Sequence, residues 1–168
     1  MSGLLHLIGE SVWFILPAYV ANATPVVLGG GARINGGKHF MNGRPIFGAG
    51  KTIRGFLTGL ITGSLAGVLQ GFIVGDLCTY PMLGFLLALG ALLGDLAGSF
   101  IKRRAGIRQG GAAPGLDQLG FLVVALLLAL PIMTPSWEMV LVLVLITPPI
   151  HFVTNLGGYA LGLKSRFY

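Results

Sequence analysis

The chain has 168 residues, of which 54% are hydrophobic and only 10% are charged, and its formal net charge is +6. A mean hydropathy of +0.86 excludes an ordinary soluble protein, because soluble domains carry roughly 25% charged residues. The length corresponds to one domain, so candidate chemistry has to come from short loops and from the ends of membrane spans.

Apolar runs of the length needed to cross a bilayer, about 20 residues, recur along the chain. We expect an all-α membrane protein, a bundle of five transmembrane helices that forms a single integral-membrane catalytic domain over residues 1–168. The fourth run is the shortest, and Pro148–Pro149 is expected to interrupt the fifth. The expected spans cover residues 4–20, 55–75, 82–101, 119–134 and 139–163, and the intervening basic loops cover 29–54 and 102–117.

The first span is followed by Ala21-Asn22-Ala23, which resembles a signal-peptidase site. The apolar run before it lacks basic residues and contains Glu10, so an uncleaved span is the preferred interpretation.

The first basic loop is rich in glycine, and repeated glycines let backbone N–H groups approach an anion. Its end, Gly48–Thr52, resembles part of a phosphate-binding P-loop, but that motif requires glycine where Pro45 stands, and no strand precedes it. A P-loop fold is therefore excluded, whereas phosphate contacts by Lys51 and Arg54 are expected. Thr52 is also placed to cap the following helix.

The second span carries glycine at every fourth position from Gly55 to Gly75, and the third repeats this spacing at Gly90, Gly94 and Gly98. Such small-residue stripes allow close helix packing. We expect the second span at the centre of the bundle, with its glycines serving packing rather than chemistry. The stripes leave oligomerisation open, because they serve dimers equally well.

Asp95 lies inside the third span, roughly 10 Å from its end, and a carboxylate in hydrocarbon indicates function. Ser99 and Lys102 follow at i+4 and i+7 on the same helix face. Asp117 begins the fourth span, so a hairpin of the two spans would bring the carboxylates together. Two carboxylates beside basic residues favour Mg²⁺ with a phosphate ligand. A structural Asp95–Lys102 ion pair is the alternative.

The fifth span places His151, Thr154 and Asn155 after its prolines. They either line a cavity or satisfy the backbone carbonyls that proline frees.

Basic residues divide the loops into two classes, because the chain start, Asp76–Pro81 and Met133–Glu138 contain no Lys or Arg. By the positive-inside rule, the N-terminus is outside, and the C-terminus and both basic loops are cytoplasmic, as in a multi-pass protein of the cell membrane. The basic side holds Arg33, Lys38, Arg44, Lys51, Arg54, Lys102, Arg103, Arg104, Arg108, Lys164 and Arg166.

The segment from Gly94 to Asp117 resembles the signature of the phosphatidate cytidylyltransferase family, through Gly94-Asp95-Leu96, Lys102-Arg103 and Leu116-Asp117. It departs from the bacterial pattern at Arg108-Gln109, where that pattern has Lys-Asp, and at Gln118, where it has Arg. These departures, together with Asn42–Gly55, are similar to the archaeal branch, the CDP-archaeol synthases.

The resemblance implies an enzyme that transfers a cytidylyl group from CTP to a prenylated glycerol phosphate lipid and releases pyrophosphate. It implies Mg²⁺ held by Asp95 and Asp117, with these two acids and Lys102 as catalytic residues. Its implied partners are CTP, the lipid and the bilayer, with no nucleic acid. The implied nucleotide and phosphate contacts are Asn42, Lys51, Thr52, Arg54, Ser99, Arg103 and Arg108.

Two alternatives remain from the residues. A CTP-dependent polyprenol kinase would use similar substrates but transfer the γ-phosphoryl group. A small transporter would use Asp95 as a coupling carboxylate, although the absence of a visible inverted repeat argues against it. No residue distinguishes ether from ester chains or cytosine from other bases.

Overall fold

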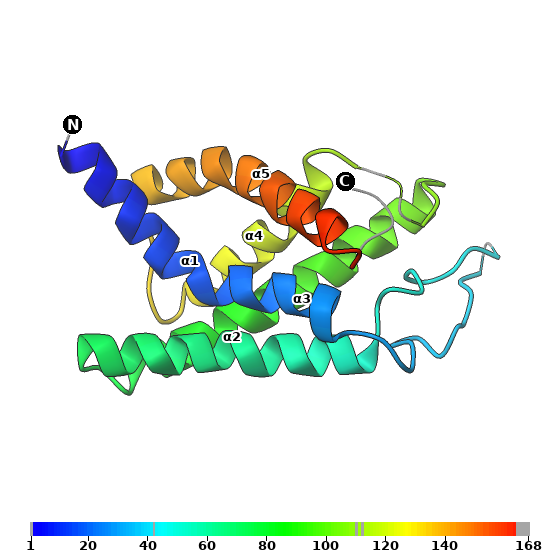
Figure 1. Ribbon diagram of the computed structural model, residues 1–168, viewed down its shortest axis with the longest axis horizontal. Helices are drawn as coiled ribbons and strands as arrows, with labels where there is room; N and C mark the ends of the chain where they lie inside the picture. Colours follow the sequence, from blue (N-terminus) through cyan, green and yellow to red (C-terminus); the bar gives the residue numbers. More distant parts are fainter. Residues whose placement is uncertain (1, 42, 110, 112, 164–168) are drawn as a thin grey trace.

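The computed structural model describes residues 2–41, 43–109, 111 and 113–163, and its regular secondary structure in these ranges is entirely α-helical. The helices are α1 (Ser2–Leu28), α2 (Ile53–Val74), α3 (Thr79–Arg104), α4 (Leu116–Ala129) and α5 (Trp137–Ala160), as Figure 1 shows. All except α4 are long and apolar enough to cross a membrane. Helices suit this environment because they satisfy their own backbone hydrogen bonds.

Local side chains define where the helices start. The Thr52 hydroxyl accepts a hydrogen bond from Gly55 N–H at 3.1 Å and caps α2, as the sequence predicted. Ser136 caps α5 in the same way through Met139 N–H. Before α3, the Asp76 carboxylate accepts hydrogen bonds from the N–H groups of Thr79 and Cys78, which hold the pKa of Asp76 below its ordinary value.

Two helices are central: α1 packs against all four other helices, and α3 packs against α1, α2 and α4. The expectation that α2 occupies the centre is wrong, because in the described residues α2 packs only against α1 and α3. Figure 1 shows α2 along one edge of the bundle and α5 along the opposite edge. The glycine stripe of α2 marks one close-packed side, while its other side exposes Leu57, Ile61, Leu65 and Leu69.

The glycine stripes bring helix backbones into direct contact, as predicted. A Cβ atom added at Gly67 would lie 2.6 Å from the Gly84 Cα atom, so α2 and α3 touch without intervening side chains. Between α3 and α4, a Cβ at Gly90 would lie 2.6 Å from the Ala125 Cα atom. Side chains larger than hydrogen are therefore excluded where these helices cross.

The helices α1 and α5 contain prolines, and both helices continue through them. Figure 1 shows α1 changing direction near its middle. Pro17 is one of two prolines inside this helix. Pro17 has no N–H to bond the Trp13 carbonyl, and the Gln70 side chain of α2 donates to that carbonyl at 2.6 Å instead. The expected interruption at Pro148–Pro149 is wrong, because α5 continues through both residues. The helix α1 likewise continues past the predicted end at residue 20.

Candidate active site

Both basic loops lie at the end of the bundle where α3 finishes (Figure 1). Arginine contacts join them. Arg44 Nη1 donates to the Arg104 carbonyl at 2.6 Å, and Arg104 Nη2 donates to the Pro45 carbonyl at 2.6 Å. The Arg104 guanidinium also lies over the rings of Phe40 and Phe100, 4.7 and 5.0 Å from their centroids. These contacts hold the first loop against α3 and give Arg44 and Arg104 a structural role.

Gln109 provides a second link between the loops. Its side-chain Oε1 atom accepts a hydrogen bond from Ala49 N–H at 3.1 Å. The sequence drew attention to this position because it carries an amide where the bacterial signature has an acid. In the structure it holds the segment directly before Lys51 in place.

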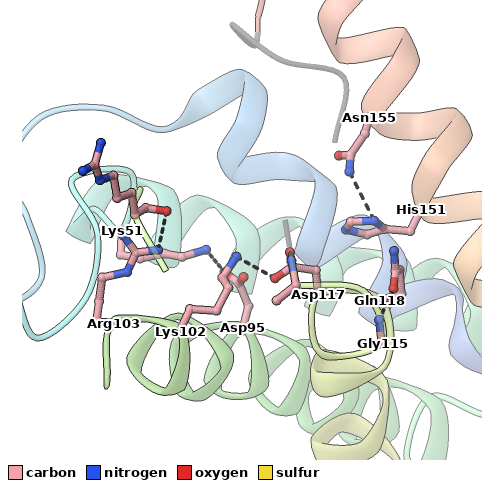
Figure 2. Close-up of polar contacts among 11 residues, drawn as sticks. Lys51, Asp95, Lys102, Arg103, Gly115, Asp117, Gln118, His151 and Asn155 are labelled. Atoms are coloured by element: carbon pink, nitrogen blue, oxygen red, sulfur yellow. Dashed lines mark hydrogen bonds and ion pairs between the residues drawn. The ribbon is translucent and has the colours of Figure 1, made fainter. Parts of the chain in front are cut away.

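Asp95 and Asp117 each pair with a lysine, as Figure 2 shows. Asp95 pairs with Lys51 from the first loop, and Lys102 Nζ lies 2.6 Å from Asp117 Oδ1. The side chains of Lys102 and Asp117 are only 15% and 24% exposed, so water screens this pair less than a surface pair. Among the described residues Asp95 pairs with Lys51 rather than with Lys102, which the sequence had suggested as a structural alternative.

Asp117 lies about one helical turn nearer the end of α3 than Asp95, because α4 starts within the bundle. A Cβ at Gly94 would lie 2.6 Å from the Gly120 carbonyl oxygen, and one at Gly98 would lie 3.8 Å from Leu116. The start of α4 is therefore level with Gly98, about 9 Å before the end of α3 at 1.5 Å per residue. The helix α4 has 14 residues, and it begins and ends earlier than the predicted range 119–134.

The turn before α4 is fixed around Asp117. The second carboxylate oxygen of Asp117 accepts the Ala113 N–H at 2.9 Å, and Gln118 Oε1 accepts the Gly115 N–H at 2.5 Å. Gly115 has a φ of 82°, in the left-handed region that favours glycine. Gln118, the position where the bacterial signature has arginine, therefore stabilises the start of α4.

A basic cavity of about 360 Å³ lies between the two loops, and its lining contains no Asp or Glu. Arg103, which is only 8% exposed, donates from Nη2 to the Arg108 carbonyl at 3.2 Å. Its buried Nε atom has no hydrogen-bond partner among the described residues. The arrangement suits an anion, because the cations that line it are Arg33, Arg44, Arg103 and Arg108.

A larger cavity of about 700 Å³ lies between α1 and α5, and its lining includes both Lys51 and Asp95. Ala49 belongs to the lining of both cavities, so this part of the first loop is their common wall. Polar residues of α5, namely His151, Thr154 and Asn155, also line it. Of the two roles that the sequence left open for these residues, the structure supports cavity lining.

Of the remaining residues predicted to contact the nucleotide or phosphate, only some line a cavity. Thr52 is buried and lines the larger cavity. Ser99 is buried in α3, and Arg54 is exposed in the first turn of α2; neither lines the two cavities described above. Asn42 falls outside the described residues. Arg33 and Arg44 were missed as cavity residues, and only their positive charge in a glycine-rich loop signalled them.

Asp95 and Asp117 supply too few ligands for a metal site built from protein side chains alone. They suit a magnesium ion that also binds substrate phosphates. The described residues contain no cluster of three or more His, Cys, Asp or Glu side chains. Mg²⁺ is usually held by one or two carboxylates together with substrate phosphates, which matches one acid from α3 and one from α4. Each acid now contacts a lysine ammonium, a cation that phosphate oxygens could bind instead.

A family model described as CDP-archaeol synthase, CarS-like, matches residues 4–168. The chain belongs to this family. CDP-archaeol synthase of Thermococcus kodakarensis is 49% identical over 97% of this chain and 98% of its own length. The corresponding protein of Pyrococcus furiosus is 52% identical over 96% of this chain, and that of Methanococcus aeolicus is 46% identical over 98%.

A solved structure supports the same family. It is described as an intramembrane enzyme for archaeal membrane lipids biosynthesis, and it matches with a TM-score of 0.82 and 41% identity. The match covers 89% of this chain and 94% of that chain. The fold is therefore that of an intramembrane enzyme, and the family favours cytidylyl transfer over the kinase and transporter alternatives.

Proposed function

We infer that this chain is a CTP-dependent cytidylyltransferase that produces CDP-archaeol in archaeal lipid biosynthesis. The active site is placed at two neighbouring cavities that share Ala49 in their linings. One is lined by arginines, and the other is lined by Lys51 and Asp95. A charged nucleotide and a membrane lipid need such separate approaches, because one comes from water and the other from the bilayer.

The nucleotide triphosphate is assigned to the basic cavity. Arg103 and Arg108 would contact phosphate oxygens, and the guanidinium fork suits such contacts. The buried Nε of Arg103, which has no described partner, supports this assignment. The α-phosphorus would then lie toward the common wall, near Lys51.

Asp95 and Asp117 would hold Mg²⁺, with the remaining positions taken by water and phosphate oxygens. Bound there, the ion would offset the charge that develops on the triphosphate. Lys51 and Lys102 would exchange their carboxylate contacts for phosphate contacts.

The reaction is a displacement at phosphorus. An oxygen of the lipid phosphate attacks the α-phosphorus of CTP, and a new P–O bond forms. The bond from the α-phosphorus to the oxygen bridging it to the β-phosphorus breaks, and pyrophosphate leaves with that electron pair. Lys51, Lys102 and Arg103 stabilise the negative charge and fix the orientation of the phosphates.

The membrane arrangement is inferred from charge. The proposed chain is a single catalytic domain in the cell membrane, with its N-terminus outside and its active site and C-terminus on the cytoplasmic side. On this view α4 enters from the cytoplasmic side and, together with residues 130–136, completes a fifth crossing.

Purified full-length protein given Mg²⁺, an isoprenoid ether-lipid phosphate and CTP labelled at either the α- or the γ-phosphorus tests the reaction. The α-label should enter the lipid phase, and the γ-label should appear in pyrophosphate. Entry of the γ-label into lipid would identify a kinase. If neither label reaches intact lipid substrate, the proposed reaction is wrong.

A further inference from the structure

The larger cavity combines a polar floor with an apolar rim. Lys51, Thr52 and Asp95 lie at the floor, where the loops meet α3. At the rim, Val27 of α1 is 62% exposed, and Leu161, directly after α5, is 76% exposed. A cavity with this polarity can admit a charged headgroup while attached hydrocarbon chains stay outside between α1 and α5.

We propose that this cavity binds the phosphate monoester of the lipid substrate and that His151 of α5 contacts that phosphate. The proposal rests on the function inferred above and adds His151, a residue outside the cytidylyltransferase signature, to the lipid half of the reaction. His151 acts here by binding and orienting, so it is not required to transfer a proton.

The His151 ring is held in a defined orientation. Figure 2 shows Asn155, one turn later on α5, pointing at the ring, and Asn155 Nδ2 lies 3.2 Å from His151 Nδ1. On the α4 side, the ring stacks on Phe121 with centroids 6.4 Å apart. An amide NH₂ group can only donate, so in this arrangement Nδ1 accepts, and the proton of a neutral ring is on Nε2. An Nε2–H group is a donor of the kind that a phosphate oxygen accepts.

The ring is supported from the opposite side of the cavity as well. Phe121 packs edge-on against Tyr19 of α1, with centroids 6.1 Å apart. Tyr19 in turn shares a 2.8 Å hydrogen bond with Thr147 of α5. These contacts tie α1, α4 and α5 together at the depth of His151.

Lys51 and His151 offer a phosphate group in the cavity one cation and one N–H donor. Among the residues that the structure describes, the titratable side chains that line it with His151 are Tyr19 of α1, Lys51 of the first loop and Asp95 of α3. A phosphate dianion beside Asp95 would be repelled unless a cation is close. Lys51, which forms an ion pair with Asp95, is such a cation. His151 adds a donor from α5, so the phosphate can be held from two separate elements.

The test is steady-state kinetics of the full chain with the two substrates varied in turn. His151→Leu should raise the KM for the isoprenoid ether-lipid phosphate at least about tenfold and leave the KM for CTP unchanged. His151→Gln, whose amide can place an N–H near the position of Nε2, should restore most of the lipid KM. Asn155→Leu, which removes the orienting contact, should produce a smaller rise of the same kind.

The matched control is His6→Leu, an exposed histidine near the start of α1 that pairs with Glu10. It should leave both KM values unchanged. Glycerol phosphate without chains should compete with the lipid only weakly, because the rim contacts are missing. Strong competition by glycerol phosphate would mean that the cavity recognises free phosphate esters rather than a lipid.

If wild-type protein transfers the cytidylyl group but His151→Leu leaves the KM for the lipid unchanged, the lipid-site assignment is wrong. An equal rise in the KM for CTP would also overturn that assignment. If wild-type protein does not transfer the cytidylyl group, the proposed function itself fails.

Discussion

The middle of the bundle and its loop end are built by opposite means. In the middle, glycines let backbones touch, as at Gly67 and Gly84, and neighbouring side chains are apolar. At the loop end, charged side chains reach across gaps between elements, as Lys51 does to Asp95 and Arg44 to the end of α3. The first region tolerates almost no added volume, whereas the second is hollowed by cavities.

This difference separates stability from chemistry along the same helix. Helix α3 contributes Gly84 and Gly90 to packing, and Asp95, Lys102 and Arg103 to the candidate site. Substitutions in the two regions should therefore have different consequences, and the following variants test that separation.

The largest effect is expected from Asp95→Asn and Asp117→Asn. Each keeps the shape of the side chain but removes a charge proposed to hold Mg²⁺, so kcat should fall at least about 100-fold. The unfolding temperature should change little in Asp95→Asn, because Asn still offers Lys51 an acceptor oxygen. It should fall more in Asp117→Asn, because one amide oxygen cannot accept from both Lys102 and the Ala113 N–H. Near-normal turnover in either variant would contradict the metal assignment.

Gly67→Leu should lower stability rather than remove a catalytic group. Its Cβ would lie 2.6 Å from the Gly84 Cα atom, so α2 and α3 would have to separate. We expect a loss of about 1–3 kcal/mol or more in the free energy of unfolding, seen as a lower unfolding temperature in detergent. Gly9→Leu is the control, because nothing lies within 4 Å of a Cβ there. Equal destabilisation by both substitutions would argue against tight packing at Gly67.

Arg108→Gln tests the basic cavity. This exposed residue lines the cavity, and losing its charge should raise the KM for CTP about tenfold without changing the lipid KM. Arg54→Gln is the comparison, since Arg54 lies outside both cavities, and a smaller effect is expected. A larger rise for Arg54 than for Arg108 would move the triphosphate toward the start of α2.

Gln109→Leu should give a moderate effect by releasing the wall between the cavities. Losing the acceptor for Ala49 N–H should lower kcat/KM about fivefold, the equivalent of one neutral hydrogen bond. Gln109→Glu keeps an acceptor oxygen and should retain more activity. If the two variants behave alike, the hydrogen bond to Ala49 does not position the site.

The smallest effect concerns Asp76, at the opposite end of α3 from the site. Its pKa is lowered in the folded protein by hydrogen bonds from Thr79 and Cys78, so its contribution to stability is present above the unfolded pKa of about 3.9. That contribution is lost as the pH falls through the folded pKa. Asp76→Asn should therefore flatten the acid side of the unfolding-temperature profile, with activity near neutral pH unchanged. An unaltered acid profile would show that these hydrogen bonds do not contribute.

Part of the fold could be predicted because it depends on local pattern. Apolar runs predicted each helix, the four-residue glycine spacing predicted close packing, and Thr52 predicted the start of α2. The central position of α2 was predicted wrongly, because a small-residue stripe specifies one packed face and does not say whether the other face meets lipid. The interruption of α5 was also wrong, since a helix can continue through Pro148–Pro149.

By itself, the sequence determined the helical membrane character and the division into loops with and without basic residues. It also determined that two acids lie near a basic cluster in the chain. These follow from composition and spacing. Only the tertiary structure decided that Asp95 pairs with Lys51 and Lys102 with Asp117, and that His151 and Lys51 line one cavity. These partners lie on different elements, so no local pattern selects them. The Lys102–Asp117 pair, for example, depends on the depth at which α4 packs on α3, with backbone contact at Gly94.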